Sequence, residues 1–494
     1  MSTKLLLSLA LTSLIASTHL LAQNDTDMDL GGFDTEELTN EDSNDLDGFS
    51  DEESETNSNE KVLAPKKQSI FSINGNLAFK TSYGYIPHSV KAHQVDTKPV
   101  DYSGFNQAQT SLYLQVDGKL SDDWKVRISG DTFYDALYDI RTNNDYNQDT
   151  LDDYRTQIRF DDTYIQGRLS RSIDVKVGRQ IVVWGKSDSI RITDVINPID
   201  NRLPGMTDIE DLRLSTTMAK LDYYLGQWNF SAMAIGETRT FIESAPRSEF
   251  FPVDSIFPGA PDPFITLENP EISWDNMQYA FAANGIFSGW DLSFYGADVL
   301  DSRWHIEGSL PNATREVSKI QMLGSAINIV TGSWLLKSEV AYIDGIKYNS
   351  TLDEKARVDT LVGVDYMGIK DSVLSLEIAN KRIFDYETQM SGAPTGIIPY
   401  VPDYTQEDEV QTAIRATRSF ENDSINTTVL LSMFGHNWQY GGFFRASVTY
   451  DVVDAVVANF GVIDYIDAAK KEDKPFMNAI SNNDRVFADI TYSF

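Results

Sequence analysis

From Ser69 onward the chain is a run of segments with alternating apolar and polar residues, joined by connections of two very different lengths. Tight turns such as 121–123 and 226–227 alternate with long polar connections, the longest at about 186–212 and 239–271. Alternation with period two predicts strands that have one apolar face. Short turns at one end and long loops at the other are typical of a membrane-spanning antiparallel barrel. We count about eighteen strands, and 16–18 fit the pattern. They include strands at 124–138 and 173–184, and a loop is expected at about 301–313.

Tryptophan recurs at one position of this pattern. Trp124, Trp228, Trp290 and Trp334 each follow a tight turn directly and begin a predicted strand. Amphipathic aromatic rings gather at the two membrane–water interfaces, so the four residues predict an aromatic girdle at the turn end. A soluble β-sandwich, the competing fold, gives no reason for this recurrence. The fold class predicted is therefore all-β, a transmembrane antiparallel β-barrel.

The last ten residues, 485–494, form a predicted strand that closes the sheet against 69–85. Its alternate positions are apolar, namely Val486, Ala488, Ile490, Tyr492 and Phe494. Tyr492 and Phe494 resemble the C-terminal signal by which the barrel assembly machinery recognises outer-membrane proteins. The resemblance implies location in the outer membrane of a Gram-negative bacterium, among outer-membrane lipids and lipopolysaccharide.

Two segments precede the predicted barrel at 69–494. Residues 1–22 have the charge and hydropathy pattern of a secretory signal peptide. Residues 23–68 hold 15 acidic residues and three lysines, and so few large apolar residues that we predict a disordered periplasmic tail. With a formal net charge of −33 for the whole chain, nucleic acid is not an expected partner.

The acidic tail contains a repeat. The pattern D-L-x-G-F-x-x-E-E occurs at 29–37 and again at 45–53. Two interpretations stay open, namely a pair of docking motifs for a periplasmic or RND-type transport partner, and drift within a low-complexity segment. The spacing of Asp25, Asp27, Asp29 and Glu36 is that of a calcium-binding loop, but Leu30 stands where such a loop needs glycine, so no metal site is predicted.

The connection at 186–212 is too apolar for a solvated loop, so we predict that it folds into the barrel and constricts the lumen. The candidates for constriction or for anchoring this loop are Arg179, Gln180, Asp188, Arg191, Asp194, Asn197 and Asp200. The connection at 239–271, with Phe250, Phe251, Ile256, Phe257, Phe264 and six prolines, is a second candidate for a lid. Ordinary capping of the barrel end is the alternative for both connections.

Charged residues alternate with the apolar stripes and predict a water-filled lumen. The lumen candidates are Lys125, Arg127, Asp174, Lys176, Lys220, Asp222, Arg415 and Arg445. Both signs are present, so the alternative is that these residues only pair with one another. A barrel of about eighteen strands is wide enough for an aqueous channel unless something fills it.

Arg179 is an exception to the alternation, because it shares parity with Val175 and Val177 and would face lipid. A charge there costs several kcal/mol. We predict a bulge at Gly178 that turns Arg179 inward, where it anchors the inserted loop through Asp188, Asp194 or Asp200.

Several short motifs lie near the inserted loop. Residues 177–180 (V-G-R-Q), 184–185 (W-G), 196–200 (I-N-P-I-D) and 203–205 (L-P-G) resemble the signature of an uncharacterised family of proteobacterial outer-membrane proteins. That family is often encoded beside RND-type permeases. The match covers roughly 160–225, and the chain departs from it in its acidic tail and at Lys186, where an acidic residue is expected. The resemblance implies a barrel linked to the traffic of lipid or other hydrophobic compounds.

The predicted function is an outer-membrane channel or conduit for a small solute or a lipid-like molecule. The alternative is a surface-exposed binding or structural protein without transport activity. No catalytic motif accompanies the histidines at 88, 93, 305 and 436, so no enzyme activity and no cofactor are predicted.

Overall fold

The computed structural model describes residues 70–94, 98–142, 144–257, 259–268, 270–308, 312–392, 403–470 and 474–494. These residues belong to one unit, Ile70–Phe494. The predicted signal peptide at 1–22 and the predicted acidic tail at 23–68, with its repeat, lie outside the described residues.

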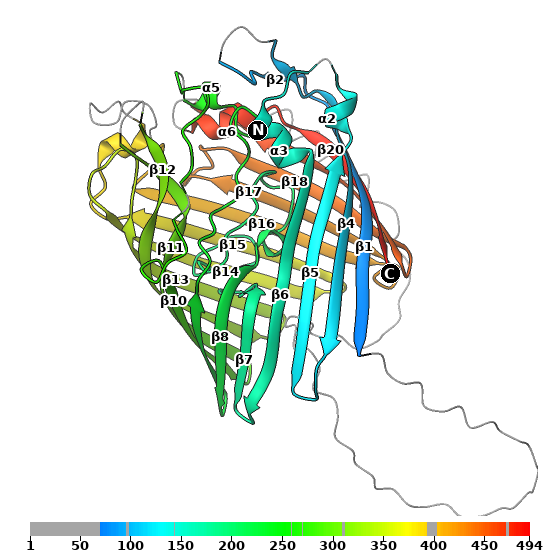
Figure 1. Cartoon of the computed structure of the whole chain (residues 1–494), viewed down its shortest axis with the longest axis vertical. Helices are drawn as coiled ribbons and strands as arrows, with labels where there is room; N and C mark the ends of the chain where they lie inside the picture. The colour runs from blue at the N-terminus through cyan, green and yellow to red at the C-terminus, as the bar shows by residue number, and fades with distance from the viewer. Residues whose placement is uncertain are drawn as a thin grey trace, which may run out of the picture. The chain divides into compact units, whose positions relative to one another are not determined.

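Eighteen antiparallel strands form a single closed sheet, which confirms the predicted barrel (Figure 1). Each strand pairs with its neighbours in chain order, and β1 pairs with β4 on one side and with β20 on the other. In the closing pair Leu77 lies opposite Tyr492, and Lys80 lies opposite Asp489. The strand at the chain end therefore closes the barrel as predicted.

The strands have the following bounds: β1 Phe71–Gly84, β4 Gly104–Lys119, β5 Trp124–Asp135, β6 Thr156–Ser170, β7 Ile173–Gln180, β8 Thr216–Leu225, β9 Trp228–Ile235, β10 Gln278–Phe287, β11 Trp290–Glu307, β12 Thr314–Thr331, β13 Trp334–Ile346, β14 Lys355–Ile369, β15 Ser372–Ile383, β16 Asp408–Phe420, β17 Ile425–Phe434, β18 Gly442–Val453, β19 Val456–Ile466 and β20 Arg485–Ser493. A separate pair, β2 (Ser89–Val90) and β3 (Val100–Asp101), lies in the first long connection.

Short helical segments occur only in the long connections of the described chain. They are α2 Leu137–Ile140, α3 Gln148–Tyr154, α4 Ile209–Leu212, α5 Val253–Ile256, η1 Thr388–Ser391 and α6 Pro475–Ile480. Asn147 caps α3, since its side-chain oxygen accepts from the backbone N–H of Thr150. Across the described residues, no helix combines the length and the apolar character needed to span a membrane.

The predicted tryptophan positions are confirmed, because Trp124, Trp228, Trp290 and Trp334 are the first residues of β5, β9, β11 and β13. Three of them contact a ring on the same or a neighbouring strand, and Trp290 stacks on Phe287 with ring centroids 4.2 Å apart. A Cβ at Gly167 would meet the Trp124 ring at 2.3 Å, so glycine is needed opposite that ring.

Three predicted strand boundaries are wrong. Strand β5 ends at Asp135 and not at 138, because the Asp135 carboxylate accepts from the backbone N–H groups of Ala108 and Leu137 and turns the chain into α2. Strand β7 ends at Gln180 and not at 184. The predicted loop at 301–313 is mostly strand, because Asp301–Arg303 form a bulge that shifts the β11–β12 register without ending it.

The barrel interior has an apolar wall on one side. Buried apolar residues of β8–β17 form one cluster with residues of the connection that follows β7. Its members are Val182, Trp184, Ile190, Ile192, Ile196, Met218, Met233, Ile235, Ala280, Ala282, Tyr295, Ala297, Val299, Ile320, Met322, Ala326, Ala341, Ile343, Ile346, Leu361, Ala379, Ala413 and Leu430. This side of the lumen is therefore filled by protein.

Candidate functional site

The connection between β7 and β8, residues 181–215, is the candidate site; we call it the inserted segment. Asn197 fixes it to the strand ends from which it starts and to which it returns. Its side chain accepts from the backbone N–H of Val182 at 2.8 Å and donates to the carbonyls of Leu214 at 2.8 Å and Gln180 at 3.3 Å. Asn197 is fully buried, and no water is needed to satisfy these groups.

Residues 185–193, the first arm, lie against the wall formed by β11–β15. The Glu377 carboxylate accepts from Ser187 Oγ at 2.7 Å and from the backbone N–H groups of Asp188 at 2.9 Å and Ser189 at 3.1 Å. The Glu339 carboxylate accepts from the backbone N–H of Ser187 at 2.8 Å and from the Thr193 hydroxyl at 2.8 Å. Two buried carboxylates on neighbouring parts of the wall thus hold one arm.

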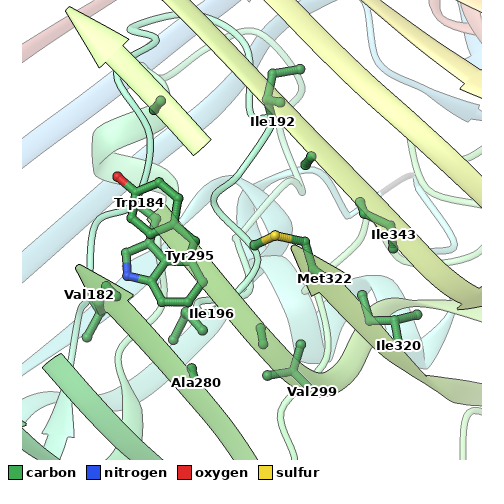
Figure 2. Packing of buried hydrophobic residues seen from close by; sticks show 14 of the residues in the cluster. Val182, Trp184, Ile192, Ile196, Ala280, Tyr295, Val299, Ile320, Met322 and Ile343 are labelled. Carbon is green, nitrogen blue, oxygen red and sulfur yellow. The ribbon is translucent and has the colours of Figure 1, made fainter. Parts of the chain in front are cut away.

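The same arm adds an ion pair, and Trp184 directly before it adds a ring stack. Lys337 pairs with Asp188 of the arm and, at 2.8 Å, with Asp365 of β14. Trp184 stacks on Tyr295 of β11 with centroids 4.8 Å apart. Figure 2 shows Trp184, Ile192 and Ile196 turned toward the apolar wall beside Tyr295, Met322 and Val299. The first arm and its flanking residues therefore fill the side of the lumen that has the apolar wall.

Residues 200–213, the second arm, contact the next part of the wall, which is formed by β16–β19. Asp208 pairs with Arg415 at 3.0 Å and with Arg445. Tyr465 of β19 donates its hydroxyl to the Pro204 carbonyl at 2.6 Å. Gly205 has φ +76°, and a Cβ there would lie 3.0 Å from the Phe443 ring, so the arm touches β18 closely.

The start of the second arm is tied to β6. Asp200 pairs with Arg202 at 2.5 Å and with Arg159 at 3.4 Å, and Arg202 donates to Gln157 at 3.0 Å. Between the arms, Asp194 accepts from Arg191 at 3.1 Å and from Arg213 at 2.9 Å. The inserted segment therefore crosses the lumen with contacts to both parts of the wall.

A polar cavity of about 740 Å³ remains beside the second arm. Its wall consists of β1, β4–β6 and β17–β20, together with residues of the inserted segment and of the next long connection. Its charged lining residues are Lys80, Arg159, Arg202, Arg445, Arg485, Asp131, Asp135, Asp161, Asp200, Asp208, Asp211, Glu249 and Asp489. The open part of the lumen thus carries both signs of charge.

In the connection between β9 and β10, residues 236–277, the stretch 244–253 is almost entirely buried, as a lid would be, whereas 271–275 are exposed. Phe250, Phe251, Ile256, Phe257 and Phe264 are all buried in two apolar clusters that include α6 and β19 residues. Glu249 fixes the lid, since its carboxylate accepts from Arg485 at 2.6 Å and from His88 at 3.0 Å. Burial would raise the pKa of Glu249, but Arg485 and His88 hold that pKa below its usual value.

The lumen candidates fall into two groups. Arg415 and Arg445 contact the inserted segment through Asp208. Arg127, Asp174, Lys176, Lys220 and Asp222 instead make contacts within the wall: Arg127–Asp117 at 2.7 Å, Arg168–Asp174 at 3.7 Å, Lys220–Asp222 at 2.9 Å, and Lys176 over the Tyr164 ring at 3.7 Å. Lys125 is exposed at the start of β5.

The predicted bulge at Gly178 is absent. The β6–β7 and β7–β8 ladders continue through Gly178 and Arg179 without a register shift. Gly178 has φ +129°, and a Cβ there would meet the Thr163 carbonyl oxygen at 2.3 Å, so this residue allows close strand approach without changing the alternation.

Arg179 consequently stays on the face of the exposed Val177 and does not anchor the inserted segment. It pairs with Glu237 and donates to the Phe160 carbonyl at 3.0 Å, in place of the predicted contacts with Asp188, Asp194 or Asp200. Gln180 is buried and donates to backbone carbonyls at the end of β7 and in β8.

Sequence reasoning missed the anchors on the wall and in the lid. Glu339 and Glu377 lie at inward positions two residues before a small buried alanine, Ala341 and Ala379, but Lys337 shares the inner stripe of Glu339. A buried carboxylate needs hydrogen-bond donors, but a lysine on the same strand could supply them, so these stripes alone do not indicate a contact with the inserted segment. Asp208 and Glu249 lie in loops, where no periodicity distinguishes them.

In the described ranges, no group of three or more His, Cys, Asp or Glu side chains is arranged to hold a metal ion.

Comparison with known proteins gives one full-length match. Residues 5–494 match the family model described as "Protein of unknown function (DUF1302)". No curated protein matches the chain significantly.

Solved structures show low similarity. OccAB3 of Acinetobacter baumannii is 10% identical with a TM-score of 0.48, over 85% of this chain and 99% of that chain. The outer membrane protein OpdK of Pseudomonas aeruginosa is 11% identical with a TM-score of 0.44, over 86% and 98%. OmpF of Salmonella typhi, in complex with daunomycin, is 10% identical with a TM-score of 0.40, over 86% and 97%. The function of this chain must therefore be argued from its own residues.

Proposed function

The chain belongs to the DUF1302 family of proteins of unknown function, and on this premise we propose that it is an outer-membrane channel. In this proposal the inserted segment restricts passage through the lumen to the polar cavity along one wall.

The outer face of the barrel supports the membrane location. Large apolar side chains are exposed on the outward face of nearly every strand, among them Ile73, Phe281, Val362 and Ile490. Such a belt is unfavourable in water and is what contact with hydrocarbon requires. Aromatic residues at the turn end, including Trp290 and Trp334, are placed for the membrane–water interface.

The single observation that carries the proposal is the attachment of the inserted segment to two parts of the lumen wall, β11–β15 and β16–β19. Glu377 holds the first arm, Arg445 holds the second, and the polar cavity of about 740 Å³ is what remains open. A loop that merely capped the barrel end would not need buried charged partners on inner walls. The mixed charges of the cavity support passage of small polar solutes.

The rival is a surface-binding or structural protein that conducts nothing. Single-channel recording in planar bilayers distinguishes the two, using the full chain and a variant in which a short Gly-Ser linker replaces 186–205. Heat-modifiable migration in detergent gels establishes that each protein is a folded barrel.

We expect steady conductance from the full chain and a larger conductance from the deletion variant, because the deletion removes most of the first arm. Absence of conductance from both folded proteins would overturn the channel proposal. Equal conductance of the two would show that the first arm does not constrict the path.

The predicted acidic tail completes the proposal. We propose that 23–68 docks a periplasmic or RND-type transport partner through its repeated motif. A pull-down with residues 23–68 checks this, since changing Phe33 and Phe49 to alanine should abolish capture if the motif is the contact.

A further inference from the structure

The barrel wall has a notch at its loop end. Strands β7–β10 have only 8, 10, 8 and 10 residues, whereas the flanking strands β6 and β11 have 15 and 18 (Figure 1). The β6–β7 ladder ends at the pair Thr163–Arg179, and the β10–β11 ladder ends at Tyr279–Asp298. Residues 156–162 of β6 and 299–307 of β11 therefore have a strand neighbour on one side only.

The β11 side of the notch is closed by the lid connection. The backbone N–H of Phe241 donates to the Ser302 carbonyl at 3.2 Å, and Leu300 donates to the Gln278 side chain at 2.8 Å. The next residue, Ile242, exchanges backbone hydrogen bonds with Ile199 and Asn201 of the inserted segment at 3.0 and 2.8 Å. Loop and inserted segment thus continue the wall from β11 almost to β6.

The β6 side is different, because only side chains cross it. Arg202 reaches Gln157, Asp200 reaches Arg159, and Arg179 reaches the Phe160 carbonyl. Among the described residues, no backbone–backbone hydrogen bond joins 156–162 to any segment other than β5. We call this line of side-chain contacts the β6 seam.

The β6 seam separates the cavity from the outer surface. Gln157, Arg159 and Asp161 line the cavity from inside. On the outside, Ile158 is 85% exposed and Phe160 is 64% exposed, so this stretch lies in the apolar belt. An unpaired sheet edge is costly against hydrocarbon, so polar groups or a ligand must occupy it there.

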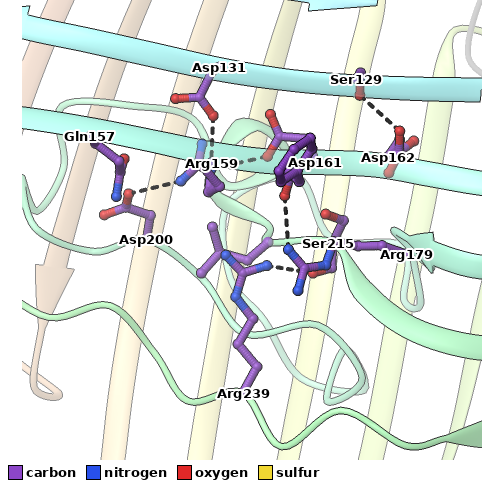
Figure 3. Close-up of polar contacts among 12 residues, drawn as sticks. Ser129, Asp131, Gln157, Arg159, Asp161, Asp162, Arg179, Asp200, Ser215 and Arg239 are labelled. Carbon is purple, nitrogen blue, oxygen red and sulfur yellow. Dashed lines mark hydrogen bonds and ion pairs between the residues drawn. The ribbon is translucent and has the colours of Figure 1, made fainter.

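Arginines gather at the seam (Figure 3). Arg159 pairs with Asp131 at 2.9 Å and with Asp161 at 3.0 Å, and Arg179 pairs with Glu237. Arg239 donates to the Ser215 carbonyl at 2.6 Å and forms no ion pair within the described part of the chain. Its guanidinium therefore has donors left for an anion beside an exposed apolar surface.

We propose that the β6 seam is a lateral portal that passes a single-chain amphiphile with an anionic head group between the cavity and the lipid-facing surface. The head, a carboxylate or a phosphate, contacts Arg239 and Arg179, while the tail lies along Ile158 and Phe160. This inference rests on the proposed channel and names a second class of molecule for its lumen.

The test uses the absence of cysteine from the chain. In the variant D162C/Q180C, oxidation closes the seam at the end of the ladder, because these two positions continue the β6–β7 register by one pair beyond Thr163–Arg179, on the face opposite to exposed Val177. The matched control is V362C/I378C, two outward residues that lie directly opposite each other in β14 and β15. The single variants D162C and Q180C show the effect of each substitution without the link.

The measurements are the association rates of fluorescent dodecanoate and dodecyl phosphate with the full barrel in nanodiscs, compared with neutral dodecyl maltoside. Oxidation of D162C/Q180C should slow the association of both anionic probes at least tenfold, reduction should restore the rate, and the control pair should show no change. R239A should slow the association of both anionic probes about tenfold, because a charge-assisted hydrogen bond is lost, and should leave that of the maltoside unchanged. R239K should restore the rate in part.

Unchanged association rates after complete oxidation of D162C/Q180C would overturn the portal, as would equal effects of R239A on anionic and neutral probes. If R239A slows only dodecyl phosphate, the head group is a phosphate. If it slows only dodecanoate, the head group is the carboxylate of a fatty acid. Ion conductance is recorded in parallel. If the protein conducts ions but the seam test fails, only the portal is refuted. If the protein does not conduct ions, the channel itself is refuted.

Discussion

The attachment of the first arm to Glu377 can be tested by a single substitution. Glu377→Ala removes the acceptor of three hydrogen bonds, from Ser187 Oγ and from the backbone N–H groups of Asp188 and Ser189. Hydrogen bonds to a charged group contribute about 1.5–3 kcal/mol each, but neighbouring bonds are not additive and Glu339 still holds the arm. We therefore take about 3 kcal/mol for the loss of docking free energy.

A loss of about 3 kcal/mol raises the undocked population of the arm roughly a hundredfold. In planar bilayers, Glu377→Ala should show frequent transitions to a larger conductance that the wild type visits rarely. Limited proteolysis should cut the variant within 185–193 faster, because an undocked arm exposes its backbone.

The matched control is Glu407→Gln, which removes one charge of a half-exposed surface pair with Arg382. A pair of this kind contributes little, so conductance and proteolysis should stay as in the wild type. The reasoning is refuted if Glu377→Ala shows neither the larger conductance nor faster cleavage, or if Glu407→Gln behaves in the same way.

Three further predictions follow from other contacts. Asn197→Ala should lower the free energy of unfolding by about 2–4 kcal/mol, since buried strand-end groups lose their partner; the midpoint of heat-modifiable migration measures this. The pKa of Glu249 is lowered in the folded protein, so the Glu249–Arg485 contact adds stability that is lost as pH falls below the usual glutamate range and the carboxyl group protonates. The protease sensitivity of the lid should therefore rise at acid pH, and Glu249→Gln should remove that pH dependence. Deleting Phe494, which exchanges two backbone hydrogen bonds of 2.9 Å with Gly75, should reduce the yield of assembled barrel while the conductance of assembled molecules stays unchanged.

The barrel was predictable because local sequence patterns indicate the strands, the turns and the aromatic girdle. Trp290 follows a tight turn, and the alternation around Ile490 indicates which side chains face outward without reference to any neighbouring strand. Strand ends were less predictable, because they depend on distant partners: the Asp135 carboxylate ends β5 by accepting from Ala108 of another strand.

The site was predictable only in part. The apolar residues of the inserted segment indicated that it folds inward, and Asn197 lies at its anchor. Arg179 was misplaced, because the sequence indicates the cost of an outward charge but not that Glu237, 58 residues away, neutralises it. Glu377 reaches the arm across a separation of 189 residues, and no local pattern encodes such a pairing.

Those separations also set an order of events during assembly. The first arm is held by a residue 189 positions further along the chain, and Arg445 holds the second arm across 237 positions. Contacts of this range form late, since a long loop must be closed before they contribute any stability. The inserted segment can therefore make these two contacts only after β15 and β18 have joined the sheet, late in assembly.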